Sequence, residues 1–330
     1  MASGEVDLSV QEFLKELPSF SKKGITEFAL HDKKISSDKS ALAEICRAVK
    51  KSAPDLFLTL QIAVSALDKN LVHLLQDIYC SIEIPLSGTE KGANLLFDKK
   101  IYSSKAQMLN TEGLVFGFDM AYGIQPGDSF KAFRDRLDFA VTLYPNHIDF
   151  AQLQGKMVLP RSTGIYSSKD LEFSREMAFA CQTFYSAGRA VPWFNSVVKS
   201  LKISPTAFFA DFSEWQRCNN CSLDSDFRPD DAKQIDVEKM QLNFLKQKYE
   251  EKHKSMLYDA AADMVRLNGA FSRMVAEGEE SIVETRYNPD DILSPYSMDI
   301  ARFAESATME SCRVKIFSTD EGPDYEIIGS

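Results

Sequence analysis

The sequence predicts an α/β fold in which parallel strands alternate with helices and curl into an open, partial (β/α) TIM-like barrel. Five apolar segments have the length of strands, at residues 25–30, 56–62, 80–86, 115–121 and 148–153. Each is separated from the next by a segment with helical periodicity, and such alternation is typical of a parallel sheet. Because crossovers between parallel strands are right-handed, successive strands should curl in one direction.

Size and charge set limits on the function. The chain has 330 residues, of which 44% are hydrophobic, so it can bury one barrel-sized domain and a smaller appendage. A formal net charge of −10 argues against a broad nucleic-acid footprint. Lysines between residues 246 and 254 can still form a local basic strip, although Glu250 and Glu251 among them favour a solvated helix face.

Neither a membrane span nor a signal peptide is visible in the sequence. No apolar run approaches the ~20 residues that cross a bilayer, and the first residues are acidic without an apolar core. We therefore expect a cytoplasmic protein with no membrane partner. Six cysteines without regular spacing predict reduced thiols rather than a disulfide framework.

The segments between the strands carry apolar stripes at helical spacing. These stripes are Leu42, Cys46 and Val49 after the first strand, Leu67, Leu71, Leu74 and Leu75 after the second, and Phe173, Met177, Ala180 and Phe184 after the fifth. Residues 115–153 form the clearest unit, with a strand, a glycine-proline turn from Gly123 to Asp128, a helix, and a second strand. The stripe of this helix is Phe130, Phe133, Leu137, Ala140 and Val141.

The pattern changes after Pro192. Residues 193–201 and 205–215 predict short helices, and the charged stretch 230–276 predicts two helices with a break near Lys254 or Gly269. Short strands then follow at residues 282–287, 312–317 and 324–328, around a helix near 298–305. We therefore predict a partial barrel over residues 1–222 and a C-terminal helical and α+β extension over 223–330.

Residues 117–128, GFDMAYGIQPGD, and 145–153, PNHIDFAQL, resemble the late barrel segment of the radical S-adenosylmethionine superfamily, especially its cobalamin-binding branch. The family phrase is similar to G-x-D-x-x-Y-G-x-P-G-D, followed by a helix and P-x-x-I-x-x-x-x-L. The resemblance extends back through CSIEIPLSGTEKG and GITEFALHDKKIS and covers roughly residues 8–215. It implies a partial barrel of the radical S-adenosylmethionine type, with S-adenosylmethionine and a 4Fe–4S cluster as cofactors.

The cluster in this family is held by three cysteines spaced C-x-x-x-C-x-x-C after the first barrel strand, and no such triad occurs in this sequence. Only Cys218 and Cys221 lie close together. They are weak metal candidates, since half of a zinc or iron–sulfur site, a redox pair and two ordinary thiols all match a lone C-x-x-C. We assign no metal ligands.

Polar residues gather where the predicted strands end, which is where parallel sheets bind ligands. The candidates for a ligand pocket are His31, Asp32, Glu83, Ser87, Gly88, Asp119, Tyr122, Gly123, His147, Asp149 and Gln152. The resemblance implies three contacts with S-adenosylmethionine. Asp32 would face the amino group of its methionine part, Ser87 would face the ribose or the carboxylate, and the turn that begins at Gly123 would face the edge of the adenine. The family's arginine after the serine-glycine pair has no counterpart in residues 93–102, which removes a bidentate anchor for the carboxylate.

Other roles are open to the same residues. A carboxylate inside a strand, such as Glu83 or Asp149, can serve as a structural acceptor for backbone or hydroxyl groups. His31 and His147 can transfer protons or, with Asp32 or Asp149, bind a metal.

Three functional hypotheses follow. The first is a degenerate or partial radical S-adenosylmethionine-like protein, not catalytic by itself, that binds a small polar ligand or a protein partner at the barrel mouth. The second is a portion of an active cobalamin-type enzyme whose cluster loop lies upstream. The third is a non-radical acid–base enzyme that uses His31, Asp32, Asp119 and His147.

Overall fold

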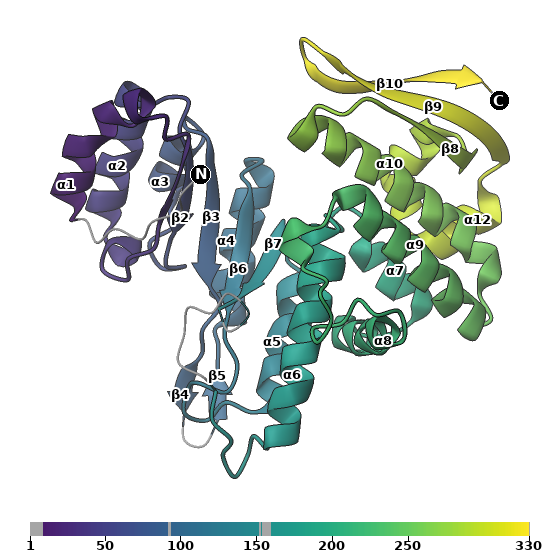
Figure 1. The fold of residues 1–330 in the computed structure, drawn as a ribbon, viewed down its shortest axis with the longest axis horizontal. Coiled ribbons are helices and arrows are strands. Elements are labelled where there is room, and N and C mark those ends of the chain that lie inside the picture. The colour runs from purple at the N-terminus through teal and green to yellow at the C-terminus, as the bar shows by residue number, and fades with distance from the viewer. Residues whose placement is uncertain (1–8, 92–93, 152, 154–159, 330) are drawn as a thin grey trace. The chain divides into compact units, whose positions relative to one another are not determined.

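The computed structural model describes residues 9–91, 94–151, 153 and 160–329 (Figure 1). The chain forms two compact units. The first contains the residues up to Ala121 together with Leu143–Pro145, and the second contains Tyr122–Thr142 and the residues from Asn146 onward. The predicted domain boundary after residue 222 stays a prediction.

The five predicted strands are present. They are β1 (Glu27–Leu30), β2 (Phe57–Gln61), β3 (Cys80–Pro85), β6 (Phe116–Met120) and β7 (His147–Phe150). They form one sheet in the order β1-β2-β3-β6-β7, and the pairings of β1 with β2, β2 with β3 and β3 with β6 are all parallel. The predicted α/β fold with a parallel sheet is therefore confirmed, whereas closure of the strands into a partial barrel stays a prediction.

The helices of the first unit are α1 (Val10–Glu16), α2 (Lys39–Ser52), α3 (Lys69–Leu75) and α4 (Lys99–Thr111), with 3₁₀ turns at Leu17–Ser19, Ser21–Lys23 and Ile35–Ser37. Three of these helices begin in the same way. Asp38, Asp68 and Asp98 precede α2, α3 and α4, and each carboxylate accepts two backbone N–H groups of the first turn. An aspartate N-cap satisfies donors that have no partner inside the helix, so these residues fix where each crossover helix starts.

One face of the first unit's strands is apolar. Leu58, Leu60, Ile82, Phe116 and Phe118 alternate along β2, β3 and β6 with polar residues or glycine, and all five are at most 1% exposed. Helix α4 packs on this face, because the Tyr102 ring centroid lies 6.1 Å from that of Phe118. A short antiparallel hairpin of β4 (Thr89–Lys91) and β5 (Asn94–Leu96) follows β3.

The second unit opens with the predicted turn and helix α5 (Phe130–Val141). Asp128 organises the turn: its carboxylate accepts the Gly123 N–H at 2.8 Å and pairs with buried Arg136 at 3.2 Å. The N-cap itself is Ser129. On α5, Phe133, Leu137, Ala140 and Val141 are fully buried, as the stripe predicted.

Seven further helices lie among the described residues of the second unit. They are α6 (Ser168–Cys181), α7 (Phe194–Leu201), α8 (Pro205–Cys218), α9 (Gln234–Glu251), α10 (Tyr258–Glu277), α11 (Pro289–Leu293) and α12 (Ile300–Ser306), with 3₁₀ turns at Pro229–Asp231, Ser255–Leu257 and Pro295–Met298. The predicted break near Lys254 separates α9 from α10, while Gly269 lies inside α10. None of the helices in the described part of the chain is long and apolar enough to cross a membrane.

Helix α6 continues into a π-helix, Gln182–Ala187. A π-helix leaves backbone carbonyls without their usual partners. Here the Gln241 amide of α9 donates to the carbonyls of Phe184, at 2.7 Å, and Gly188, at 3.1 Å. Phe184 is also the centre of an aromatic core, with ring centroids 4.8 Å from Phe208 and 4.9 Å from Phe212.

The C-terminal part of the second unit is a three-stranded antiparallel sheet in the order β10-β9-β8. Its strands are β8 (Ser281–Tyr287), β9 (Met309–Thr319) and β10 (Gly322–Gly329). Asp263 of α10 is fully buried and accepts the backbone N–H groups of Arg286, at 2.6 Å, and Tyr287, at 3.0 Å. The sheet is thus fixed to α10 through its edge strand.

Candidate ligand site on the polar face of the parallel sheet

The strand face opposite the apolar one is polar. The register places Thr59 beside Ser81, Gln61 beside Glu83, and Pro85 beside Asp119. Because side chains alternate along a strand, these residues share the face that Leu60, Ile82 and Phe118 do not use. Gln61, Glu83 and Asp119 lie in the C-terminal halves of their strands.

His31 extends this polar row to the edge strand. It directly follows β1, next to the position that pairs with Leu60. Its Nε2 lies 2.9 Å from Oε2 of Glu83, with the two side chains 32% and 18% exposed. Since β2 lies between β1 and β3, this contact reaches over the Gln61 position.

Gln61 joins the other end of the row. Its amide nitrogen lies 3.4 Å from Oδ2 of Asp119, across the intervening strand β3. Gln61 was not among the predicted site residues. The signal for it is present in the sequence, because Leu58, Leu60 and Ile62 are apolar and the alternate positions are polar.

Two half-buried carboxylates, one amide and one imidazole therefore meet on a single sheet face. Carboxylates accept hydrogen bonds, while the amide and the imidazole can both donate and accept. Such a face is suited to a small ligand that carries N–H or O–H donors or a positive charge.

The remaining candidates of the first unit have local structural partners. Oδ1 of Asp32 accepts the backbone N–H groups of Lys34, at 2.7 Å, and Ile35, at 3.0 Å, and these bonds hold the Asp32 pKa below its usual range. Ser87 is exposed. A side chain at Gly88 would place its Cβ 2.5 Å from Cγ of Leu95, so the hairpin packing requires glycine there.

The second unit holds the other predicted residues. Tyr122 is 1% exposed, and burial raises the pKa of its hydroxyl to about 12. Gly123 has φ +65°, and a side chain there would overlap Leu171. His147 Nδ1 contacts Oδ2 of Asp149 within β7. Gln152 lies outside the described residues. The two histidine–carboxylate pairs, His31 with Glu83 and His147 with Asp149, thus belong to different units.

Five of the six cysteines are buried thiols with raised pKa values, which disfavours metal binding. Burial raises the pKa of both Cys46 and Cys80 to about 12 and that of Cys221 to about 11. Cys181 and Cys312 are also buried with raised pKa values. The thiolate is the ligating form, so these pKa values oppose coordination. No group of three or more His, Cys, Asp or Glu side chains within the described ranges is arranged to hold a metal ion.

Comparisons with known proteins returned partial matches to solved structures only. No protein-family model and no curated protein matches the chain. Two of the matching structures are of the radical S-adenosylmethionine methyltransferase TsrM from Kitasatospora setae. The one with cobalamin and a 4Fe–4S cluster matches at 18% identity and a TM-score of 0.35, over 43% of this chain and 30% of that one. The one with tryptophan substrate and the analogue aza-SAM matches at 16% identity and a TM-score of 0.35, over 52% and 34%. This chain spans about a third of the length of these structures.

Proposed function

We propose that the polar face of β1, β2, β3 and β6 binds a small, donor-rich or cationic ligand of the chemical kind of S-adenosylmethionine. The observation that carries the proposal is the row of His31, Gln61, Glu83 and Asp119, in which polar contacts of 2.9 and 3.4 Å connect side chains from four neighbouring strands. Its place at the carboxyl ends of parallel strands supports the proposal, because ligands bind there in open α/β sheets. Residues 80–92 and 117–128 resemble segments of the radical S-adenosylmethionine superfamily, which suggests S-adenosylmethionine as the ligand with which to probe the site.

The carboxylates supply the recognition. S-adenosylmethionine carries a sulfonium, an ammonium and two ribose hydroxyls, all of which favour carboxylate partners. Glu83 and Asp119 are partly withdrawn from water, with the Glu83 side chain 18% exposed, so a charge–charge contact there is less screened than at the surface.

The proposal includes no iron–sulfur chemistry by these residues. A cluster of the implied kind needs three grouped thiolates. Of the six cysteines, five are buried and only Cys218 is exposed. The cluster therefore does not fit the cysteines of this chain, and we derive no step through it.

Calorimetric titration with S-adenosylmethionine tests the proposal directly. S-adenosylhomocysteine is a matched probe, because it has the same nucleoside and amino acid but no sulfonium charge. Glu83→Gln and Asp119→Asn each replace a carboxylate by a neutral amide of similar shape. Asp55→Asn is the matched control, since Asp55 is exposed before β2, at the opposite end of the strand.

We expect saturable binding that is tighter for the sulfonium probe. Loss of a hydrogen bond to a charged group should weaken affinity roughly 10-fold or more in Glu83→Gln and Asp119→Asn. Asp55→Asn should bind like the unmodified protein. If neither probe binds, or if both site variants keep full affinity, the polar face is not the ligand site.

A further inference from the structure

A cavity lies in the C-terminal part of the second unit. Its volume is about 720 Å³, within the range of small-molecule pockets. Helices α9 and α10 supply Glu238, Arg266 and Arg273, and strands β8 and β9 supply most of the other lining residues. None of these residues belongs to the polar face of the parallel sheet.

The cavity runs along a strand edge. Six consecutive residues of β8, 281–286, line it. Successive side chains of a strand point to opposite faces, so a space that touches all six must lie beside the strand rather than over one face. The order β10-β9-β8 makes β8 an edge strand, which leaves backbone groups available on that side.

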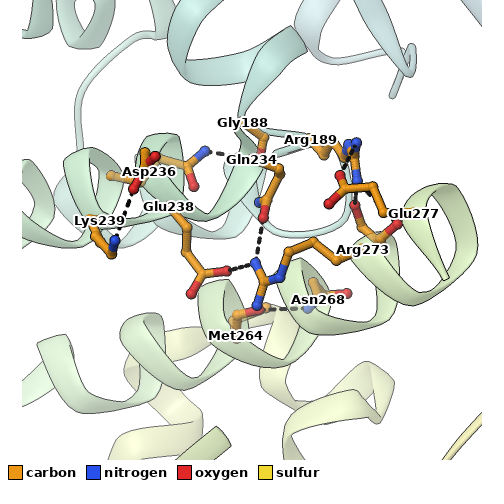
Figure 2. A network of polar contacts seen from close by, with 12 residues as sticks. Gly188, Arg189, Gln234, Asp236, Glu238, Lys239, Met264, Asn268, Arg273 and Glu277 are labelled. Atoms are coloured by element: carbon orange, nitrogen blue, oxygen red, sulfur yellow. Dashed lines mark hydrogen bonds and ion pairs between the residues drawn. The ribbon is translucent and has the colours of Figure 1, made fainter. Parts of the chain in front are cut away.

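Buried donors at this cavity have no protein acceptor. Arg273 is 2% exposed, and its NH1 is engaged by Glu238 at 2.5 Å and by Gln234 (Figure 2). In contrast, Arg273 Nε and Ser281 Oγ have no hydrogen-bond partner among the described residues. The Gln234 amide nitrogen, beside Arg273, also has none there. Buried polar atoms are usually hydrogen-bonded, so these three groups favour a ligand rich in acceptors.

Two of the arginines at the cavity keep guanidinium donors available for an anion. Four arginines and three glutamates line it. The charge of Glu238 is offset by Arg273, and Arg266 is paired with Asp263 at 3.2 Å. Arg286 and Arg313 are exposed, and neither is paired with a carboxylate in the described part of the chain. Glu279 and Glu284 also line the cavity, so its charges nearly balance, and an anion is favoured by the available guanidinium N–H donors rather than by an excess of positive charge.

We propose that this cavity binds a small organic oxyanion, whose phosphate or carboxylate oxygens accept hydrogen bonds from Arg273 and Ser281 while Arg286 and Arg313 balance its charge. A guanidinium matches both kinds of oxyanion. The site is independent of the polar face of the parallel sheet, so either proposal can fail without the other.

Thermal unfolding followed by tryptophan fluorescence tests this site. Both tryptophans, Trp193 and Trp215, lie in the second unit, so the signal reports the unit that contains the cavity. Pyrophosphate and citrate are the probes for phosphate and carboxylate chemistry, and sodium chloride at equal ionic strength is the reference. A ligand that binds only the folded state raises the midpoint temperature in proportion to the logarithm of its concentration.

Ser281→Ala is the decisive variant. Without an anion it should be as stable as the unmodified protein or more stable, because it removes a buried hydroxyl that has no partner. With the anion it should raise the half-saturating concentration roughly 2–10-fold, the cost of one lost hydrogen bond. Ser318→Ala, at an exposed position of β9 outside the cavity, should leave both values unchanged.

Arg286→Gln and Arg313→Gln provide a second measure, since removal of either charge should weaken anion binding without disturbing the core. Saturable stabilisation by one probe and not the other would identify the oxyanion chemistry. If neither probe raises the midpoint beyond the chloride reference, the cavity binds no oxyanion and the proposal is overturned. If Ser281→Ala and both arginine variants keep the full shift, only an adventitious ion is bound, which overturns the proposal as well.

Discussion

Replacing Gly269 with alanine should destabilise the second unit, even though alanine is the better helix former. Gly269 lies inside α10, and a Cβ built there would overlap Oε2 of Glu238 and lie 3.3 Å from NH1 of Arg273. The Glu238 carboxylate cannot simply move away, because it is 5% exposed and is held by Arg273 (Figure 2). The methyl group should therefore break a buried ion pair.

Two opposing contributions to the free energy of unfolding decide whether Gly269→Ala stabilises or destabilises the protein. Alanine gains about 1 kcal/mol over glycine in a helix interior. Disruption of a buried ion pair, in contrast, costs about 3–5 kcal/mol, because one charge is left without compensation. The free energy of unfolding should therefore fall by about 2–4 kcal/mol in Gly269→Ala. Urea denaturation followed by fluorescence of Trp193 and Trp215 measures this value for the second unit.

A background without the ion pair gives the stringent control. In Glu238→Ala/Arg273→Met the atoms that meet the methyl group are absent, so Gly269→Ala should then stabilise by about 1 kcal/mol through helix propensity alone. This reversal of sign is specific to the proposed cause. Equal destabilisation in both backgrounds would show that α10 resists the methyl group for another reason, and the argument would fail.

Three further predictions concern the core, the buried acid and the cysteines. Phe133→Ala and Leu137→Ala should each lower the free energy of unfolding by ~2–5 kcal/mol, because both side chains are fully buried, whereas exposed Lys131 and Asp135 should change it by less than about 0.5 kcal/mol. Burial raises the pKa of Asp263 to about 6, so the folded state binds its proton more tightly than the unfolded state. Relative to Asp263→Asn, the protein should therefore lose about 2 kcal/mol as the pH rises from 4 to 6.5, and a pH-independent difference between the two denaturation curves would contradict this. Anaerobic reconstitution should leave far less than one cluster per chain, and iron and sulfide analysis near four of each would refute that expectation.

The strands were predictable because their signal is local. Strand β2 and the residue that follows it show apolar Leu58, Leu60 and Ile62 at every second position, and this pattern also decides which face of the sheet is polar. The same is true of the break between α9 and α10. The hairpin of β4 and β5 was not predicted, because two strands of three residues each carry too little periodicity to stand out.

Buried charges were the features that the sequence could not reveal. Arg136 lies beside Leu137 on α5, and its burial depends on Asp128, eight residues earlier in the turn. Glu238 and Arg273 are 35 residues apart and meet only because α9 and α10 pack together. Lys248, which the charge pattern placed on a solvated face, is 8% exposed and contacts Asp211 and Glu251. In each case tertiary packing brings the oppositely charged partner into contact, and a local sequence pattern contains no information about that contact.

The connectivity of the two units also limits how this chain can be divided. The backbone passes from one unit to the other after Ala121, returns for Leu143–Pro145, and leaves again at Asn146. A single protease cut after Ala121 therefore keeps every residue of the second unit, α5 included, in one fragment, but it separates the first unit from Leu143–Pro145. Gene fusion or exchange at that point has the same consequence. The second unit can thus be separated as one continuous piece of chain, whereas the first unit is complete only while the second is attached to it.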